Sequence, residues 1–187
     1  MPLDLPAALS VARLFAPIAR SLGRLFTRRS VLVTCGEGPP FALIKEGPDV
    51  HGHAVRLVRF QVTNRSRRES FECLAKLTAM VRADGKSFNN AFLPVALATQ
   101  HQVGQERERG AFNLRGGESK IVELAWLEES SPASEIRLVY ETLNYPNSVP
   151  RAHYHLTVVV YGAGKPVEAK LQLYVNGRGR LTLRGLR

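Results

Sequence analysis

Two neighbouring runs of alternating hydrophobic and polar residues dominate the middle of the chain. In the first run, one row consists of Arg56, Val58, Phe60 and Val62, and the other consists of Leu57, Arg59, Gln61 and Thr63. The second run has an apolar row of Phe71, Cys73, Ala75, Leu77, Ala79 and Val81. Successive side chains of a strand point to opposite faces, so each run predicts a strand with one buried row. The polar stretch 64–70 predicts a turn, and we expect an antiparallel hairpin whose inner row packs on a facing sheet.

The rest of the chain beyond Ser30 repeats this pattern in shorter runs. Further strands are expected at 31–35, 41–45, 92–98, 120–127, 135–141, 154–161 and 167–175, with 180–184 extending or following the last. Residues 99–119 are expected to be irregular and 142–151 to be a loop. About eight strands, separated by turn residues and not interleaved with helices, favour an antiparallel sandwich over a parallel sheet.

The N-terminal segment has a different period. Apolar residues at spacings of three and four predict an amphipathic helix over 5–29, which Pro17 kinks: Leu5, Ala8, Ala12, Phe15, Ala19, Leu22 and Phe26. No uninterrupted apolar run of about 18 residues is present, so the helix is not expected to span a membrane. The predicted organisation is a helix at 1–29 and a sandwich domain at 30–187 with a basic C-terminal tail.

Three interpretations of this helix remain open. It packs on its own sandwich or a partner protein, it lies in a membrane interface with its arginines among anionic headgroups, or it is an organelle transit peptide. The residues expected to contact the partner or membrane are Leu9, Arg13, Phe15, Arg20, Leu22, Arg24 and Phe26.

The strand pattern resembles bacterial immunoglobulin-like sandwich modules. The resemblance rests on a strand ending in Val62-Thr63-Asn64, the strand from Cys73 to Leu77, the turn 114–118 (Leu-Arg-Gly-Gly-Glu) and the strand 154–161. It implies a binding or spacer role, and it carries over no catalytic residue or cofactor. The family's inter-sheet disulfide with a central tryptophan is not evident, because Trp126 lies on a different strand.

The charge of the chain points to an anionic partner. The 187 residues have a formal net charge of +10, which favours contact with an anionic group. The fractions of apolar residues, 44%, and of charged residues, 22%, are typical of globular proteins. In immunoglobulin-like topology, the turn with Arg65, Arg67 and Arg68 shares an end with the 162–166 turn and the loop holding Arg107 and Arg109. The expected anion contacts are Arg65, Arg67, Arg68, Arg107, Arg109, Arg178 and Arg180. Aromatic residues are only 7% and fall mostly on inward positions, which does not favour base stacking.

The histidines and cysteines are the remaining candidates for chemistry. Both His51-Gly52-His53 and His153-Tyr154-His155 have metal-like spacing, but their alternation places them away from the core. A metal held by Asp49, His51 and His53 is therefore only a third hypothesis. Cys35 and Cys73 are expected to be reduced core thiols of a cytoplasmic protein, with a cross-sheet disulfide as the alternative.

These patterns predict a non-catalytic interaction module, since no nucleophile motif or phosphate-cradling loop is present. We expect it to dock on a partner protein or membrane surface through its N-terminal helix, in the cytoplasm or at the membrane periphery. The alternative is a basic accessory protein that binds nucleic acid. No small-molecule substrate is expected.

Overall fold

The computed structural model describes residues 30–46, 54–97, 99, 110–129, 135–139, 148–162 and 164–186. The chain divides into two units, Met1–Ser30 and Val31–Arg187, and every described strand belongs to the second. The predicted N-terminal helix with all its contact residues lies outside the described residues. So do the candidate residues Asp49, His51, His53, Arg107 and Arg109.

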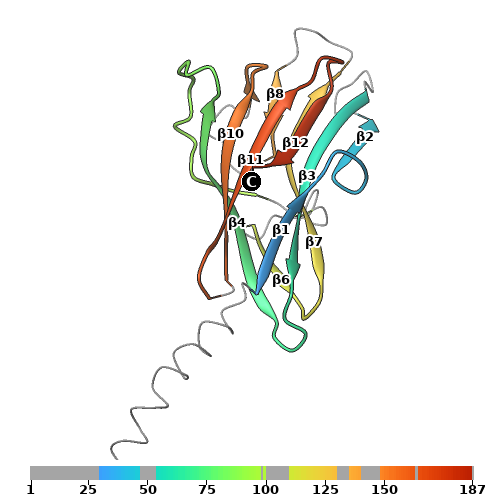
Figure 1. Cartoon of the computed structure of the whole chain (residues 1–187), viewed down its shortest axis with the longest axis vertical. Coiled ribbons are helices and arrows are strands. Elements are labelled where there is room, and N and C mark those ends of the chain that lie inside the picture. The colour runs from blue at the N-terminus through green and yellow to red at the C-terminus, as the bar shows by residue number, and fades with distance from the viewer. Residues whose placement is uncertain are drawn as a thin grey trace, which may run out of the picture. The chain divides into compact units, whose positions relative to one another are not determined.

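The described strands form two antiparallel sheets of six strands each (Figure 1). The first sheet has the order β1 (Val31–Cys35), β3 (Ala54–Asn64), β7 (Ser119–Glu128), β8 (Ile136–Leu138) and β9 (Ser148–Val149), and β2 (Ala42–Glu46) also pairs with β3. The second has the order β12 (Leu181–Gly185), β11 (Val167–Val175), β10 (Tyr154–Tyr161), β4 (Phe71–Arg82) and β5 (Val95–Ala96), and β6 (Ala111–Leu114) also pairs with β4. The predicted all-β class with antiparallel sheets is confirmed.

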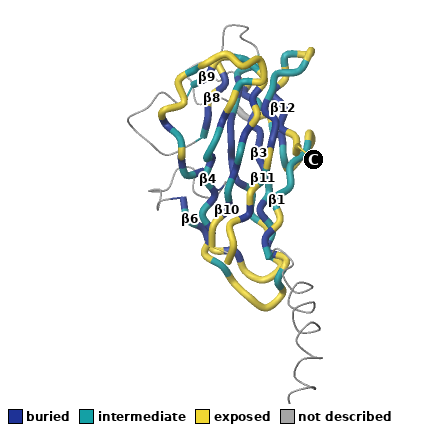
Figure 2. Tube along the Cα trace, turned by 60° about the vertical axis from the view of Figure 1, so that its left-hand side comes forward, coloured by how far each residue is buried: buried dark blue, intermediate teal, exposed yellow. Residues whose placement is uncertain are grey.

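One continuous core is built from apolar rows of both sheets. The first sheet supplies Val58, Phe60 and Val62 of β3, and the second supplies Cys73 and Leu77 of β4, all of them buried. Figure 2 shows buried positions along the strands and exposed positions concentrated in the turns. Burial of one row per strand is the main favourable term here, because apolar burial contributes about 25 cal/mol per Å².

The expected hairpin between the two principal strands is wrong. β3 pairs with β1, β2 and β7, whereas β4 pairs with β10, β5 and β6, so the connection at 65–70 crosses from one sheet to the other. Each strand has a strongly apolar row. Placing the strands in opposite sheets lets these two rows pack against each other, which pairing within one sheet does not achieve.

The inner row of β4 also departs from the simple alternation. The pairing of β4 with β10 shifts register around Thr78, because Thr157 pairs with Ala79 while the next residue, Val158, pairs with Leu77. The extra residue reverses the alternation beyond this point, as a β-bulge does. Met80 therefore enters the core, whereas Val81, which was expected inside, is 58% exposed.

Short strands account for the other differences. β6 and β9 lie within 99–119 and 142–151, which were expected to be irregular, and the strand expected at 92–98 is reduced to β5 and a bridge between Thr99 and Val122. Strands of two to four residues are too short to show an alternation of their own. They form because a neighbouring strand offers unpaired backbone groups: β4 for β5 and β6, and β8 for β9.

A buried charge pair holds the β1–β2 connection against β3. Arg59 and Glu123 are opposite residues of β3 and β7, and both are buried. The Arg59 guanidinium donates a hydrogen bond to the carbonyl of Pro40, and its backbone N–H donates to the carbonyl of Phe41 at 2.8 Å. Burial lowers the pKa of Arg59, and the Glu123 carboxylate opposes that shift. Arg59 thus fixes the connection between β1 and β2, which pair with successive parts of β3.

Asn64, the last residue of β3, organises the crossing between the sheets. Its side-chain Nδ2 donates to the carbonyl of Glu69 at 2.7 Å and to that of Leu114 in β6 at 3.2 Å. Its Oδ1 accepts from the N–H of Ser66 at 2.9 Å. Asn64 itself is fully buried, its bond to Leu114 is buried, and its bonds to Glu69 and Ser66 are part-buried. One amide therefore joins the end of the first sheet to the connection and to the second sheet.

We expect Asn64→Ala to lower the free energy of unfolding by about 2–3 kcal/mol, because the change removes three hydrogen bonds and leaves buried backbone groups unsatisfied. Urea denaturation measures the change. Asn113→Ala is the matched control, because Asn113 is exposed on β6 and should tolerate the substitution to within about 0.5 kcal/mol. Equal effects of the two substitutions would contradict the role given to Asn64.

Candidate functional site

The described arginines of the predicted anion-binding set lie at opposite ends of the two sheets. Arg65, Arg67 and Arg68 are exposed in the β3–β4 connection. The turn at 162–166 shares their end, as expected, since a Cβ at Gly162 would come within 1.9 Å of the carbonyl oxygen of Glu72, at the start of β4. The β11–β12 turn lies at the other end, because β10 begins opposite the last residue of β4 and β11 runs back along β10. The two groups of arginines therefore do not meet in one site.

The β11–β12 turn is held by one asparagine side chain. The Oδ1 of Asn176 accepts hydrogen bonds from the backbone N–H of Arg178 at 2.9 Å and of Arg180 at 3.1 Å. The backbone N–H of Asn176 donates to the carbonyl of Arg180 at 2.9 Å, and Gly179 adopts a φ of 76° that favours glycine. Arg178 and Arg180 contribute only backbone groups to these bonds, so neither guanidinium takes part in holding the turn.

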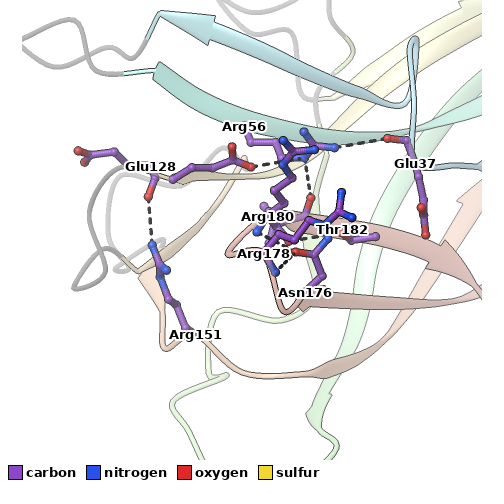
Figure 3. A network of polar contacts seen from close by, with 10 residues as sticks. Glu37, Arg56, Glu128, Arg151, Asn176, Arg178, Arg180 and Thr182 are labelled. Carbon is purple, nitrogen blue, oxygen red and sulfur yellow. Dashed lines mark hydrogen bonds and ion pairs between the residues drawn. The ribbon is translucent and has the colours of Figure 1, made fainter.

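A hollow of about 560 Å³ opens beside this turn (Figure 3). It is lined by Glu37, Arg56, Asn176, Gly177, Arg178, Arg180 and Thr182. Glu37 comes from the β1–β2 connection and Arg56 from the beginning of β3. The other five residues come from the β11–β12 turn and the start of β12. The lining residues come from both sheets, and among them are three arginines and one carboxylate, Glu37. We call it the arginine pocket.

Arg56 is the fixed member of the arginine pocket. Its Nε donates to the carbonyl of Leu181 in β12 at 2.9 Å and lies 3.6 Å from the Oε1 of Glu129. Its Nη2 donates to the carbonyl of Glu37 at 3.4 Å. The guanidinium thus links β3 of the first sheet to β12 of the second. Sequence reasoning missed this role because it placed Arg56 in the row of Val58 and Phe60 without asking what such a position meets at the end of the core.

Arg178 and Arg180 are the available members. Neither guanidinium has a hydrogen-bond or ion-pair partner among the residues that the structure describes, and both residues are exposed. A guanidinium presents a planar fork of donors that matches the oxygens of a phosphate or carboxylate. Two such forks beside a third, fixed one form a local positive field that attracts an anion into the hollow.

The described histidines face outward, as the alternation predicted. His153 and His155 are exposed, whereas Tyr154 and Leu156 between and after them are buried. The two imidazole rings meet edge to face with centroids 5.5 Å apart. Within the described ranges, no three His, Cys, Asp or Glu side chains come together as metal ligands would.

Both cysteines are free thiols, so the cross-sheet disulfide is not formed. Cys73 is buried in the core and Cys35 is half-buried at the end of β1. Burial raises the pKa of each thiol above its usual value, which reduces the thiolate fraction at neutral pH. They therefore act as small apolar core residues, in agreement with the sequence-based interpretation.

Comparison with protein-family models, with curated proteins and with solved structures finds no match to this chain. In the described part of the chain, no helix has the length and apolarity needed to cross a membrane.

The raised thiol pKa values lead to a prediction about reactivity. At pH 8 the Cys35→Ser variant, which retains only Cys73, should react with Ellman's reagent at least 100-fold more slowly in the native state than in urea, because only the thiolate attacks and burial blocks access. Absorbance at 412 nm follows the reaction. A native rate close to that of a free thiol would mean that Cys73 is neither buried nor shifted.

Proposed function

We propose that this protein is a non-catalytic binding module that recognises an anionic group of its partner in the arginine pocket. The observation that carries the proposal is the pair of uncommitted guanidinium groups of Arg178 and Arg180 on the wall of a hollow whose third arginine, Arg56, is already held by backbone carbonyls.

Electrostatics supports an anion as the ligand. Two unit charges 4 Å apart interact by about 4 kcal/mol near a protein surface, so a phosphate or carboxylate gains from both free arginines at once. The net charge of +10 adds long-range attraction that accelerates encounters with anionic partners. The Glu37 carboxylate tempers the field and offers an acceptor to a hydroxyl or amine beside the anion.

The composition of the arginine pocket supports binding over chemistry. Its one carboxylate is that of Glu37, and its one hydroxyl, that of Thr182, donates to the carbonyl of Arg180 at 3.4 Å. An activated hydroxyl nucleophile needs a base within hydrogen-bond reach, and no hydrogen bond among the described residues joins these two side chains. The proposed role is therefore recognition.

The resemblance to immunoglobulin-like modules belongs to this proposal. The neighbours β1, β3 and β7 follow the A-B-E order of such domains, and β11, β10 and β4 follow the G-F-C order. The chain departs from that pattern at β8 and β9, which come after β7, whereas strand D precedes strand E. Modules of this class commonly act as binding or spacer units.

The N-terminal segment is proposed as a second, separate attachment. Its apolar stripe and interspersed arginines suit a partner protein or an anionic membrane surface, and we propose that the protein acts in the cytoplasm or at the membrane periphery. The exposed Arg65, Arg67 and Arg68 at the other end of the sheets remain the candidates for non-specific contact with nucleic acid.

The arginine pocket is tested with inorganic tripolyphosphate as the probe, by isothermal titration calorimetry at low salt. We expect Arg178→Gln/Arg180→Gln to weaken binding at least tenfold, because both uncommitted guanidinium groups are removed. Arg65→Gln/Arg67→Gln is the matched control, since it removes the same charge at the opposite end and should change the affinity less than twofold. Equal losses in the two variants would show diffuse attraction and overturn the pocket.

The second attachment is tested by removing residues 1–29. The shortened chain should keep the melting temperature of the β-sheet unit, because all described strands lie beyond this segment. Its sedimentation with phosphatidylserine-containing liposomes, and its recovery of partner proteins in pull-downs, should be lost. Unchanged binding in both assays would remove the proposed role of the segment.

A further inference from the structure

We propose that the anionic partner is a single-stranded nucleic acid, whose phosphate binds in the arginine pocket while its bases stack on the adjoining outer face of the second sheet. This inference rests on the proposed function, since it names the class of ligand for the same pocket. It adds a surface that neither the charge nor the alternation of the sequence indicated.

A row of outward side chains crosses four adjacent strands of the second sheet. Arg184 of β12 is opposite Gln172 of β11, Gln172 is opposite His155 of β10, and His155 is opposite Val81 of β4. With strands about 4.8 Å apart, the row is about 14 Å wide. Gln172 links its neighbours, accepting a hydrogen bond from Arg184 Nε at 2.6 Å and approaching His155 Nε2 at 3.4 Å.

Flat side chains gather beside this row, on the side nearer the β11–β12 turn. The ring of Tyr174 lies 5.3 Å from that of His153, and the guanidinium of Arg184 lies 5.3 Å from the same tyrosine ring. His155 extends the group through its edge contact with His153. Val81, at 58% exposure, continues it as an exposed apolar residue. We call Arg184, Tyr174, His153, His155 and Val81 the ring face.

The arginine pocket and the ring face are contiguous along β12. Thr182 lines the pocket and is the pairing partner of Tyr174, and Arg184 follows on the same side of the strand two residues later. A ligand leaving the pocket across Thr182 therefore meets Tyr174 directly. This places a phosphate site beside a stacking surface.

This combination suits a single strand better than other polyanions. Unpaired bases stack on aromatic, histidine and arginine planes, whereas the backbone phosphates pair with arginine forks. In a duplex the base faces are covered by neighbouring base pairs, so they cannot stack on the ring face. An acidic peptide or a simple polyanion gains from the arginines alone.

Fluorescence anisotropy with fluorescein-labelled dT15 and rU15, on the full-length protein, tests the inference. We expect binding of at least one of the two oligonucleotides, tighter than binding of a 15-base-pair duplex. Tyr174→Leu should weaken binding about tenfold, the size of one lost stacking contact, while Tyr174→Phe stays close to the unmodified protein. Tyr161→Leu is the matched control, because Tyr161 is exposed at the far end of β10.

Salt dependence separates the two parts of the surface. Arg178→Gln/Arg180→Gln should flatten the slope of log affinity against log salt by about 1.4, because two phosphate contacts of a single strand are lost. Tyr174→Leu should lower the affinity and leave that slope unchanged, since stacking releases no counterions. Circular dichroism and melting temperatures establish that each variant is folded.

Several results overturn the inference. They are equal or tighter binding of the duplex, unchanged affinity in Tyr174→Leu, an equal loss in Tyr161→Leu, or displacement of the oligonucleotide by polyglutamate at matched charge concentration. If tripolyphosphate still binds in the arginine pocket, the proposed function stands and only the ligand class is wrong. If the unmodified protein binds neither tripolyphosphate nor oligonucleotide, both fail.

Discussion

The crossing from β3 to β4 is the constraint on which the architecture depends. It sends two long strands with apolar rows into opposite sheets, and the buried amide of Asn64 fixes it through bonds to Ser66, Glu69 and Leu114. A polar group without water must be satisfied inside the protein, so the connection has few alternative paths. Once β3 and β4 are separated, each becomes the centre of its own sheet, with β7 and β10 as its long partners.

The same separation creates the arginine pocket. The two sheets meet at the end where β3 begins and β12 begins, and there Arg56 bridges them by donating to the carbonyl of Leu181. An asparagine again shapes the adjoining turn, since Asn176 accepts from the backbone of Arg178 and Arg180. The side chains of Arg56 and Asn176 thus hold the site together by bonding to backbone groups. The guanidinium groups of Arg178 and Arg180 take no part in these bonds, so they remain available to a ligand.

Much of the fold was predictable because long strands carry their own signal. The alternation identified β3 and β10 with their buried rows and the outward His153 and His155, and the apolar runs of β7 and β11 identified those two strands. The reversal in β4 was not predictable, since the bulge at Thr78 is defined by pairing with β10, a strand more than 70 residues away. β6 and β9 were missed for the same reason, as their existence depends on a neighbour. For the site, Arg178 and Arg180 were identified by charge, but Arg56 and the ring face were not, because their partners are distant in sequence.

By itself, the sequence determined the all-β class, the buried row of Val58, Phe60 and Val62 in β3, that of β10, and the strongly basic charge of the chain, because periodicity and charge are properties of neighbouring residues. Only the tertiary structure decided which strands share a sheet, which end each arginine occupies, and which outward side chains meet across strands. Those outcomes depend on contacts between residues far apart in the chain, and local pattern carries no information about them.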